Sequence, residues 1–336
     1  MSVRLGVAVV GLGNAFEPHA KSLRDLLDRV EVRWAAAPSG DRLQDVASRY
    51  DFPVTTDIDR ALADPEVAAV ILLSPANTHL ELATRCFALG KHVLCEKPLD
   101  ITVERAERLV GAARQAGVRL GVVLQSRFRP GSVLLRRALQ AGTLGRIEAA
   151  SLAVPWWRPQ EYYDEPGRGT RWRDGGGVLL TQAIHALDLF RSLVGVSEVS
   201  AAQVATTALH RMETEDYAAA LVRLGNGAPG TIMATTAAYP GRAEIIRIIG
   251  TEGSALLSGG GLRLSLLDGT EEVVEDTGGT GGGASVMAFS HDAHRDLIGD
   301  FVDAIEEERD PVVSGEEALA SQRLVEAILA KARETS

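Results

Sequence analysis

A rare lysine stands at the end of a short apolar run, where it could take part in acid–base chemistry. The run closes with the residues Cys95-Glu96-Lys97-Pro98. Only four of the 35 basic residues are lysines, so a cation needed merely for solubility or pairing would be expected to be arginine. Lysine, unlike arginine, can shift its pKa on burial and pass a proton or bond a substrate hydroxyl. We predict that Lys97 is catalytic; a salt bridge with Glu96 is the alternative.

A second candidate lies in the segment DGGGVLLTQAIHALDLF, residues 174–190, where a glycine loop runs into an apolar helix. Thr181, His185 and Asp188 fall at positions i, i+4 and i+7, so a continuous helix would place them on one face. Imidazole titrates near neutral pH and suits proton transfer, and Asp188 could orient the ring. We predict His185 as the second catalytic residue. A histidine satisfied within helix packing is the alternative.

The glycine pattern GLGNAF, residues 11–16, follows a predicted strand and opens a predicted helix. This context favours a dinucleotide site, because Gly11 permits a tight turn and Gly13 lets the backbone approach a pyrophosphate. Phe16 replaces the third glycine of the usual pattern, so the helix must sit farther from the sheet or the ring must pack between them. An ordinary turn between a strand and a helix is the alternative.

Tryptophan and arginine gather in the segment PWWRPQEYYDEPGRGTRW, residues 155–172, although aromatic residues make up only 5% of the chain. Stacked aromatic faces with arginine donors suit an acidic or polyhydroxylated, ring-shaped ligand such as a sugar. We predict a substrate pocket walled by Trp156, Trp157, Arg158, Tyr163, Arg168 and Trp172. Arg127 is expected to approach the pocket from the domain junction. A loop pinned by its own aromatic cluster is the alternative.

The elements that position these residues alternate, in the first third of the chain, between short apolar strands and amphipathic helices. This alternation is typical of βαβ units in a doubly wound parallel sheet. The predicted strands span 3–12, 30–37, 67–74, 91–97 and 118–125, and the predicted helices span 19–27, 42–50, 79–89 and 102–116. Ligands bind at the carboxyl ends of strands in such a sheet, and Lys97 would lie at one of them.

Beyond about residue 127 the apolar pattern changes to period two, which is typical of a mostly antiparallel sheet. The predicted strands there span 147–157, 199–209, 217–224, 230–239, 243–250, 254–258 and 262–267, and the predicted helices span 132–141, 178–194, 294–308 and 316–334. We therefore predict an α/β domain over residues 1–124 and an α+β domain over residues 125–336. The glycine-rich stretch 277–283 is predicted to be a mobile loop.

Composition excludes several classes of protein. The 336 residues suffice for two domains, and no apolar stretch approaches the roughly 20 residues of a transmembrane helix. A net charge of −10 would repel a phosphate backbone, so no nucleic acid partner is expected. No metal is expected, because two cysteines are too few for a thiolate cage and His291 and His294 lack a third ligand at recognisable spacing. Without a disulfide scaffold or a signal-peptide cleavage site, we expect a reduced, cytoplasmic protein.

Together these motifs resemble the glucose-fructose oxidoreductase and inositol dehydrogenase family (Gfo/Idh/MocA), whose members are NAD(P)-dependent enzymes acting mostly on sugars and polyols. The resemblance covers nearly the whole chain. It rests on GLGNAF with His19 behind it, LSPANTH, GKHVLCEKP, AGTLGRI, the helix with His185, and the closing DFVDAIEEERDPVVSGEEAL. The family implies a Rossmann domain followed by an open antiparallel sheet whose exposed face forms an oligomer interface, so a homodimer or homotetramer is expected.

The resemblance also implies roles for single residues. In the family the matching lysine and histidine face the nicotinamide and the substrate carbon, and Lys97 and His185 take these roles by position. The residues that match cofactor-binding segments are Gly11, Gly13, Asn14, Ala15, Ser74, Pro75, Asn77, His79, Glu96 and Lys97. The family helix often has an aspartate where this chain has Thr181. His185 is therefore expected to be the sole proton-transfer group there, with Thr181 reduced to a hydrogen-bond donor on the substrate side.

The expected reaction is reversible oxidation of a secondary alcohol on a sugar, sugar acid or polyol. Hydride passes between the substrate carbon and C4 of nicotinamide, His185 exchanges the hydroxyl proton, and Lys97 polarises the oxygen. Two alternatives stay open: a non-redox, glycosidase-like enzyme that uses a tightly held NAD, and a sensor that binds dinucleotide without turnover. A sensor needs no catalytic lysine and histidine, so their joint presence disfavours it.

NADP(H) is expected to be favoured, with NAD(H) possible. In an NAD-specific unit an acidic residue at the end of the second strand binds the ribose hydroxyls and repels a 2′-phosphate. Ala37 occupies that place. Ser39 and Arg42 follow within reach of the adenosine ribose, and a hydroxyl with a cation could bind the phosphate. Asp41 would partly offset this charge, and Arg42 as a solvated residue of the next helix is the alternative.

Overall fold

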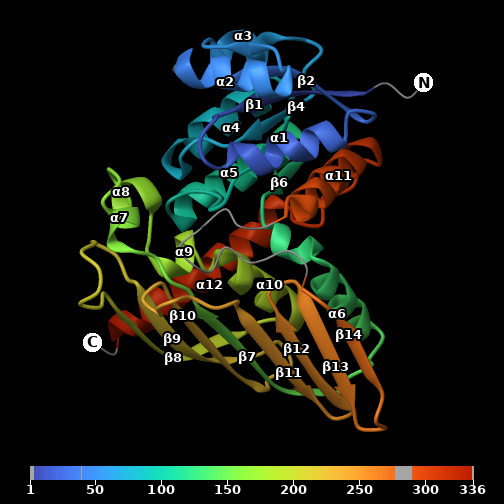
Figure 1. Ribbon diagram of the computed structural model, residues 1–336, viewed down its shortest axis with the longest axis vertical. Coiled ribbons are helices and arrows are strands. Elements are labelled where there is room, and N and C mark those ends of the chain that lie inside the picture. The colour runs from blue at the N-terminus through green and yellow to red at the C-terminus, as the bar shows by residue number, and fades with distance from the viewer. Residues whose placement is uncertain (1–3, 39, 277–289, 335–336) are drawn as a thin grey trace. The chain divides into compact units, whose positions relative to one another are not determined.

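The computed structural model describes residues 4–38, 40–276 and 290–334 of the chain, which divides into two compact units (Figure 1). The first unit comprises Met1–Val123 and His291–Leu319, and the second comprises Leu124–Ser290 and Ala320–Ser336. Two predictions, the mobile loop at 277–283 and the cofactor contact of Ser39, lie outside the described residues.

The first unit is built on a six-stranded parallel sheet with the order β3-β2-β1-β4-β5-β6. Its strands are β1 (Leu5–Val10), β2 (Val30–Ala36), β3 (Val54–Thr55), β4 (Ala69–Leu72), β5 (His92–Cys95) and β6 (Leu120–Val122). Most residues of β1, β4 and β5 are buried, as expected for a parallel sheet covered on both faces. The strand order reverses between β1 and β4, and ligands bind at the carboxyl ends of strands at such a point. The predicted doubly wound sheet is confirmed.

Helices of the first unit alternate with these strands, as the blue to cyan part of Figure 1 shows. They are α1 (Phe16–Asp25), α2 (Gly40–Tyr50), α3 (Ile58–Ala63), η1 (Ala76–Thr78), α4 (His79–Ala88), α5 (Val103–Ala116) and α11 (Asp292–Glu306). α5 begins where the Thr102 hydroxyl accepts the N–H of Arg105 and ends where Gly117 adopts a φ of 67°. The predicted division put everything beyond residue 124 in the second domain. The structure differs for 291–319, because α11 packs its apolar face against α1 within the first unit.

The second unit is built on an eight-stranded sheet with the order β14-β13-β12-β11-β7-β10-β9-β8. Its strands are β7 (Ile147–Pro155), β8 (Glu198–Ala205), β9 (Tyr217–Arg223), β10 (Pro229–Thr235), β11 (Ile245–Gly250), β12 (Gly253–Ser258), β13 (Gly261–Leu266) and β14 (Glu271–Val274). Neighbouring strands are antiparallel except β7 and β10, so the predicted mostly antiparallel sheet is confirmed. Burial alternates along β7, β10 and β12, which gives the sheet one covered and one open face.

The remaining helices are η2 (Gln125–Phe128), α6 (Pro130–Gln140), α7 (Gln160–Tyr163), α8 (Arg171–Asp174), α9 (Val178–Thr181), α10 (Ile184–Val194) and α12 (Gly315–Glu334). α6 packs on β12 and β13, and α10 packs on β7. On the open face of the sheet, the side chains of Leu221 and Ile249 are 55% and 54% exposed, respectively. The same face has a hollow of about 930 Å³ over β7 and β9–β12. Among the described residues, no single helix is long and apolar enough to cross a membrane. The bent pair Arg171–Thr181 and Ile184–Val194 meets those two criteria only when its halves are taken together.

Candidate active site

The turn after β1 has features that suit a dinucleotide. Gly11 has a φ of +101°, and a Cβ atom there would come within 2.7 Å of a backbone carbonyl carbon at the end of β4. Gly13 is half-buried, and the place of its missing Cβ lies 3.4 Å from Arg42 Nη1. Helix α1 follows with Ala15 as its N-cap, and no side chain caps its first N–H groups. Uncapped N–H donors behind a glycine turn fit the pyrophosphate of a dinucleotide.

Phe16, which replaces the third glycine, packs away from this turn. Its side chain is buried, and its ring meets the edge of the Tyr50 ring on α2 with centroids 5.6 Å apart. Asn14 is exposed at the turn. Arg42 Nη1 donates to the carbonyl oxygen of Leu12 at 3.1 Å, so the guanidinium lies over the turn.

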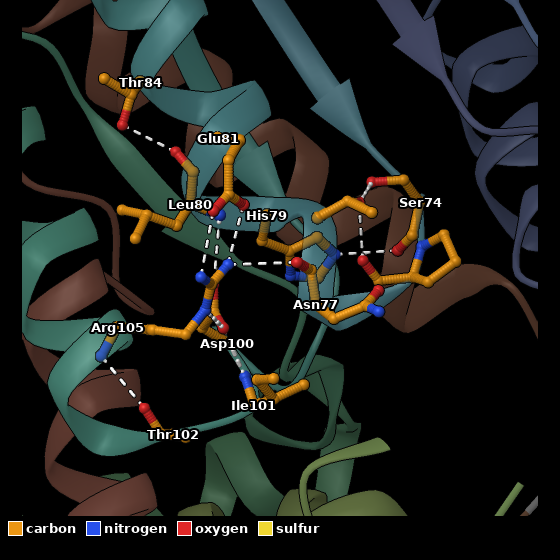
Figure 2. Close-up of polar contacts among 12 residues, drawn as sticks. Ser74, Asn77, His79, Leu80, Glu81, Thr84, Asp100, Ile101, Thr102 and Arg105 are labelled. Atoms are coloured by element: carbon orange, nitrogen blue, oxygen red, sulfur yellow. Dashed lines mark hydrogen bonds and ion pairs between the residues drawn. The ribbon is translucent and has the colours of Figure 1, made fainter. Parts of the chain in front are cut away.

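The loop after β4 carries four residues predicted to bind the cofactor. Ser74, Pro75 and Asn77 are half-buried or exposed there, as a ligand contact requires. His79 is different, because its side chain is completely buried. Its Nε2 lies 2.9 Å from the carbonyl oxygen of Ser74 (Figure 2), and its Nδ1 lies 3.1 Å from that of Pro98. His79 therefore joins the loops after β4 and β5 from inside the fold, and its contact with the cofactor stays a prediction.

A buried carboxylate that the sequence patterns did not reveal holds the same loops. Asp100 is fully buried, and it accepts the N–H of Leu80 at 3.1 Å and Nε–H of Arg105 at 2.6 Å (Figure 2). Arg105 also pairs with Glu81 and donates to the carbonyl oxygen of Asn77 at 3.1 Å. The hydrogen bonds with Glu81 and Asp100 raise the pKa of Arg105. The backbone of Asn77 is thereby fixed by a permanent cation.

Glu96 and Lys97 follow directly after β5, at the carboxyl end of the strand. Glu96 Oε1 lies 3.1 Å from His19 Nε2, and Oε2 accepts the N–H of Lys97 at 3.0 Å. The buried His19 ring packs edge-on against His294 with centroids 5.3 Å apart. Burial alone would raise the pKa of Glu96, but His19, Lys97 and His294 outweigh it and lower the pKa. Glu96, predicted to bind the cofactor, is thus an ionised internal group that holds the backbone of Lys97.

The other lysines weaken one argument for Lys97. Lys91, at the start of β5, is buried, and its Nζ donates to two backbone carbonyls of the loop between α3 and β4. Lys21 and Lys331 pair on the surface with carboxylates four and three residues away. Other lysines of this chain therefore form hydrogen bonds and ion pairs that stabilise the fold. The case for Lys97 rests on its position at a strand end and not on rarity.

The single helix predicted to carry Thr181 and His185 is broken into two. α9 ends at Thr181, α10 begins at Ile184, and Gln182 lies in the break. Thr181 and His185 are both half-buried, and the Thr181 hydroxyl donates to the carbonyl oxygen of Gly177 at 2.8 Å. The i, i+4 spacing therefore does not describe how these two side chains are related, because the backbone between them is not a regular helix.

Packing explains the glycine loop before α9. A Cβ atom at Gly177 would clash with the carbonyl oxygen of Glu215, and Gly175 has a φ of +77°. The buried carboxylate of Glu215 accepts the N–H groups of Gly177 and Leu179, both at 3.2 Å. Burial raises the pKa of Glu215. The loop needs glycine so that Glu215 can approach and cap the start of α9.

Asp188 forms a buried ion pair with Arg127. Its two carboxylate oxygens accept Nε–H and Nη2–H of Arg127, each at 2.6 Å, and Ser321 on α12 donates to Oδ1 at 2.7 Å. The Arg127 and Asp188 side chains are 4% and 0% exposed. Arg127, predicted to contact substrate, instead neutralises a buried charge. Asp188, predicted to orient His185, holds η2, α10 and α12 together.

Three residues of the aromatic segment are buried and anchor the segment to the rest of the second unit. Trp156, Arg158 and Tyr163 are all buried. Arg158 Nε donates to Gln182 Oε1 at 3.0 Å, and the Tyr163 hydroxyl lies 2.7 Å from Thr236 Oγ1. Burial lowers the pKa of Arg158. The structure gives these three residues an internal role, which differs from the prediction that they wall a pocket.

Other members of the segment remain accessible. Trp157 and Arg168 are half-buried, and Trp172 is 64% exposed. Tyr162, absent from the predicted set, is also half-buried, and its hydroxyl contacts Gln182 and Arg168. Two adjacent tyrosines look alike in a sequence, and only the bounds of α7 and the partners of each hydroxyl separate them.

Comparison with known proteins identifies the family. The model of the oxidoreductase family with an NAD-binding Rossmann fold (GFO_IDH_MocA) matches residues 5–124, and the GFO/IDH/MocA C-terminal domain model matches residues 133–256. An uncharacterized oxidoreductase of Synechocystis sp. is 30% identical over 78% of this chain and 74% of its own. The myo-inositol 2-dehydrogenase of Thermotoga maritima is 27% identical over 93% of this chain and 91% of its own.

A solved structure shares the whole architecture. The WlbA dehydrogenase from Bordetella pertussis, solved with NADH and UDP-GlcNAcA, is 29% identical and superposes with a TM-score of 0.84, covering 99% of this chain and 98% of that one. Two consecutive domain models and matches along nearly the full length agree with the two sheets described above. The chain belongs to the Gfo/Idh/MocA family of oxidoreductases with an NAD-binding Rossmann fold.

Proposed function

We propose that the protein transfers a hydride between a nicotinamide dinucleotide and a secondary alcohol or ketone of a sugar, sugar acid or polyol. The observation that carries the proposal is Lys97 at the carboxyl end of β5, one strand from the point where the sheet order reverses. Relatives named inositol dehydrogenases, from Thermotoga maritima and Rhizobium meliloti, span more than nine-tenths of the chain and support this substrate class.

The turn after β1 is proposed to hold the dinucleotide. When bound, the nicotinamide ring supplies the hydride acceptor or donor. The N–H groups at the start of α1 bind the pyrophosphate, Gly11 keeps the turn tight, and the loop of Ser74 and Asn77 lies along the cofactor. Arg105 and the buried His79 stiffen that loop from behind.

Lys97 and His185 are proposed to manage the substrate oxygen and its proton. During oxidation His185 accepts the hydroxyl proton, and during reduction it returns that proton. Lys97 donates a hydrogen bond to the same oxygen and so stabilises the negative charge that develops on it. Glu96 keeps the backbone of Lys97 in one orientation. Thr181 is proposed to accept a hydrogen bond from the substrate, because its own hydroxyl hydrogen goes to the carbonyl oxygen of Gly177.

NADP(H) is proposed as the favoured cofactor, with NAD(H) also accepted. The second strand, β2, ends at Ala36 and Ala37 follows it, so no carboxylate stands there to repel a 2′-phosphate. Arg42 supports the proposal because its guanidinium already lies over the glycine turn, bonded to Leu12. A cation next to the adenosine ribose favours the phosphorylated dinucleotide.

The direct test is to incubate the purified protein with NADP or NAD and a panel of sugars, sugar acids and polyols, and to follow the absorbance of the reduced nicotinamide. We expect turnover with at least one of them. His185→Ala should lower that turnover while leaving the dinucleotide affinity intact, because the residue acts on substrate. No absorbance change with any compound, together with unchanged dinucleotide binding in Lys97→Ala, would reject the function.

A homodimer or homotetramer is proposed from the open face of the second sheet. That face exposes Leu221 and Ile249 and is hollowed across β7 and β9–β12. Apolar side chains on an open sheet face favour burial against a partner. Light scattering coupled to size exclusion measures the assembly, and a monomer at micromolar concentration would contradict it.

A reduced, cytoplasmic setting is proposed as well. Cys86 and Cys95 are both buried, and neither forms a disulfide. Burial raises the pKa of the Cys86 thiol to about 12, so it stays protonated and unreactive. Cell fractionation tests the location.

A further inference from the structure

The hydroxyl of Tyr162 is held by two donors. Gln182 Nε2 donates to it at 2.8 Å, and Arg168 Nη1 donates to it at 2.7 Å. The Tyr162 side chain is half-buried, whereas Gln182 is 6% exposed. A buried amide and a guanidinium thus fix the position of a phenol that remains accessible.

The direction of each hydrogen bond follows from the chemistry of the groups. A guanidinium can only donate, so the Gln182 atom that faces Arg158 Nε at 3.0 Å must be the amide oxygen. The amide NH₂ therefore faces Tyr162. Arg168 can also only donate, so both lone pairs of the phenol oxygen are taken. The hydroxyl hydrogen must then point to a further acceptor, and none is found for it in the described parts of the chain.

Two guanidinium groups lie near the Tyr162 ring, and one of them, that of Arg168, also pairs with Glu165. The Arg168 guanidinium lies 4.3 Å from the centroid of the Tyr162 ring, and the Arg158 guanidinium lies 5.8 Å from it. Arg158 is 1% exposed, so its charge acts through a medium of low dielectric constant. The chain Arg158 to Gln182 to Tyr162 runs from donor to acceptor at each step, which strengthens the last O–H as a donor.

The place of the hydroxyl in the fold links it to the proposed substrate side. Gln182 is the residue that follows Thr181, in the break before the helix of His185. Tyr163, the neighbour that the sequence pattern favoured, has its hydroxyl engaged with Thr236. The two tyrosines therefore differ in their hydroxyl groups: that of Tyr162 can still donate a hydrogen bond to a ligand, whereas that of Tyr163 is hydrogen-bonded to Thr236.

We propose that Tyr162 binds the substrate by donating a hydrogen bond to the carboxylate of a sugar acid. A carboxylate only accepts hydrogen bonds, which matches a phenol that can only donate. Two guanidinium groups lie near the same ring and one carboxylate, Glu165, pairs with that of Arg168, so the remaining positive charge favours an anionic oxygen over a neutral hydroxyl. The inference rests on the proposed function for its substrate class, but it concerns binding and not hydride transfer.

The experiment compares two probes that differ only at C6, D-glucuronate and D-glucose, binding to the protein loaded with NADP. Calorimetry measures both affinities for the wild type, Tyr162→Phe and the control Tyr163→Phe. We expect the wild type to prefer D-glucuronate, and Tyr162→Phe to lose about 10-fold or more of that preference. Tyr163→Phe should keep the preference while lowering the melting temperature, because Thr236 loses a buried partner.

The ratio of the two affinities is decisive, because a loosened segment would weaken both sugars alike. An unchanged ratio in Tyr162→Phe, or tighter binding of D-glucose than of D-glucuronate by the wild type, would overturn the proposal. The proposed function fails separately: absent turnover with a Tyr162-dependent preference for D-glucuronate rejects hydride transfer and leaves the binding site. Lys97-dependent turnover with an unchanged ratio rejects only the binding site. Intact NADP affinity in each variant verifies that it is folded.

Discussion

The end of β5 and the aromatic segment were both expected to form a site, yet the two regions behave differently. Residues 95–97 lie at a strand end, as their position in the βαβ pattern required. In residues 155–172 the buried Trp156 and Tyr163 and the exposed Trp172 are mixed along one irregular stretch. In the first region backbone direction determines which side chains face a ligand, whereas in the second the partners of each side chain determine it.

The difference shows that a residue's place in the sheet topology predicts its location better than its residue type does. A parallel strand can end only at one edge of its sheet, so a residue after β5 has its location set by topology. A loop has no such rule, and an aromatic side chain in it packs wherever apolar surface is available. Residue type alone therefore predicts little in the aromatic segment.

The largest expected effect tests the strand end. Lys97→Arg keeps the charge but enlarges the group and displaces the hydrogen-bond donor from the substrate oxygen, so kcat should fall about 10³-fold with little change in melting temperature. The matched control is Lys91→Arg at the other end of β5. It should lower the melting temperature and keep kcat, because Lys91 serves two backbone carbonyls. Steady-state kinetics and differential scanning fluorimetry separate the two, and full turnover in Lys97→Arg would remove its catalytic role.

The next effect tests the division of the aromatic segment. Trp156→Ala should lower the free energy of unfolding by about 3 kcal/mol, because it leaves a cavity in a packed region. Trp172→Ala should change it by less than about 0.5 kcal/mol, because the side chain is 64% exposed. Denaturant titration measures both. If Trp156→Ala and Trp172→Ala lowered the free energy of unfolding equally, the segment would not divide into buried structural residues and accessible ones.

A smaller effect concerns the turn after β1. Arg42→Ala should weaken NADPH binding about 10-fold and leave NADH binding unchanged, because only NADPH carries the 2′-phosphate. Arg49→Ala, on the same helix but paired with Asp45 and Glu17, is the control and should affect neither. Fluorescence titration decides between them, and a wild type that binds NADH several-fold more tightly than NADPH would refute the cofactor preference.

The smallest effect is a pH dependence at Glu96. Its pKa is lowered below the ordinary 4.5, so the ionised group stabilises the fold above pH 4.5 and this stabilisation is lost as the pH falls through the lowered pKa. Glu96→Gln should be less stable than the wild type at pH 7 and lose less stability below pH 4.5. Melting curves across this range measure it, with the exposed Glu161→Gln as a control. If the melting temperatures of Glu96→Gln and the wild type fell equally with decreasing pH, Glu96 would not be an ionised carboxylate held by His19.

Periodicity predicted most of the fold, because long buried strands and amphipathic helices impose clear spacing on apolar residues. It missed β3, β14 and α3, which span two, four and six residues and are too short to show a period. It also missed the break at Gln182. The apolar pattern continues on both sides of Gln182, so it gives no sign of a break. In the structure the Gln182 side chain instead forms hydrogen bonds with Arg158 and Tyr162.

Within the candidate site, sequence identified the glycine turn and the position of Lys97 but not the groups that hold them. His79 and Arg127 are polar residues next to family motifs, and nothing local distinguishes a ligand contact from an internal one. Their roles depend on partners far away in the chain: Pro98 for His79, and Asp188 for Arg127. Asp100 and Tyr162 escaped notice for the same reason.

The discontinuity of the first unit has a consequence for how the chain matures on the ribosome. Residues 1–123 emerge first, yet α11, which packs on α1 and brings His294 to His19, emerges only after residue 290. A nascent chain halted before α11 therefore has all eight strands of the second sheet synthesised, but an α1 whose apolar face is still uncovered. The nucleotide-binding unit, although first in translation, is completed only at residue 319, after the strands β7–β14 of the second unit.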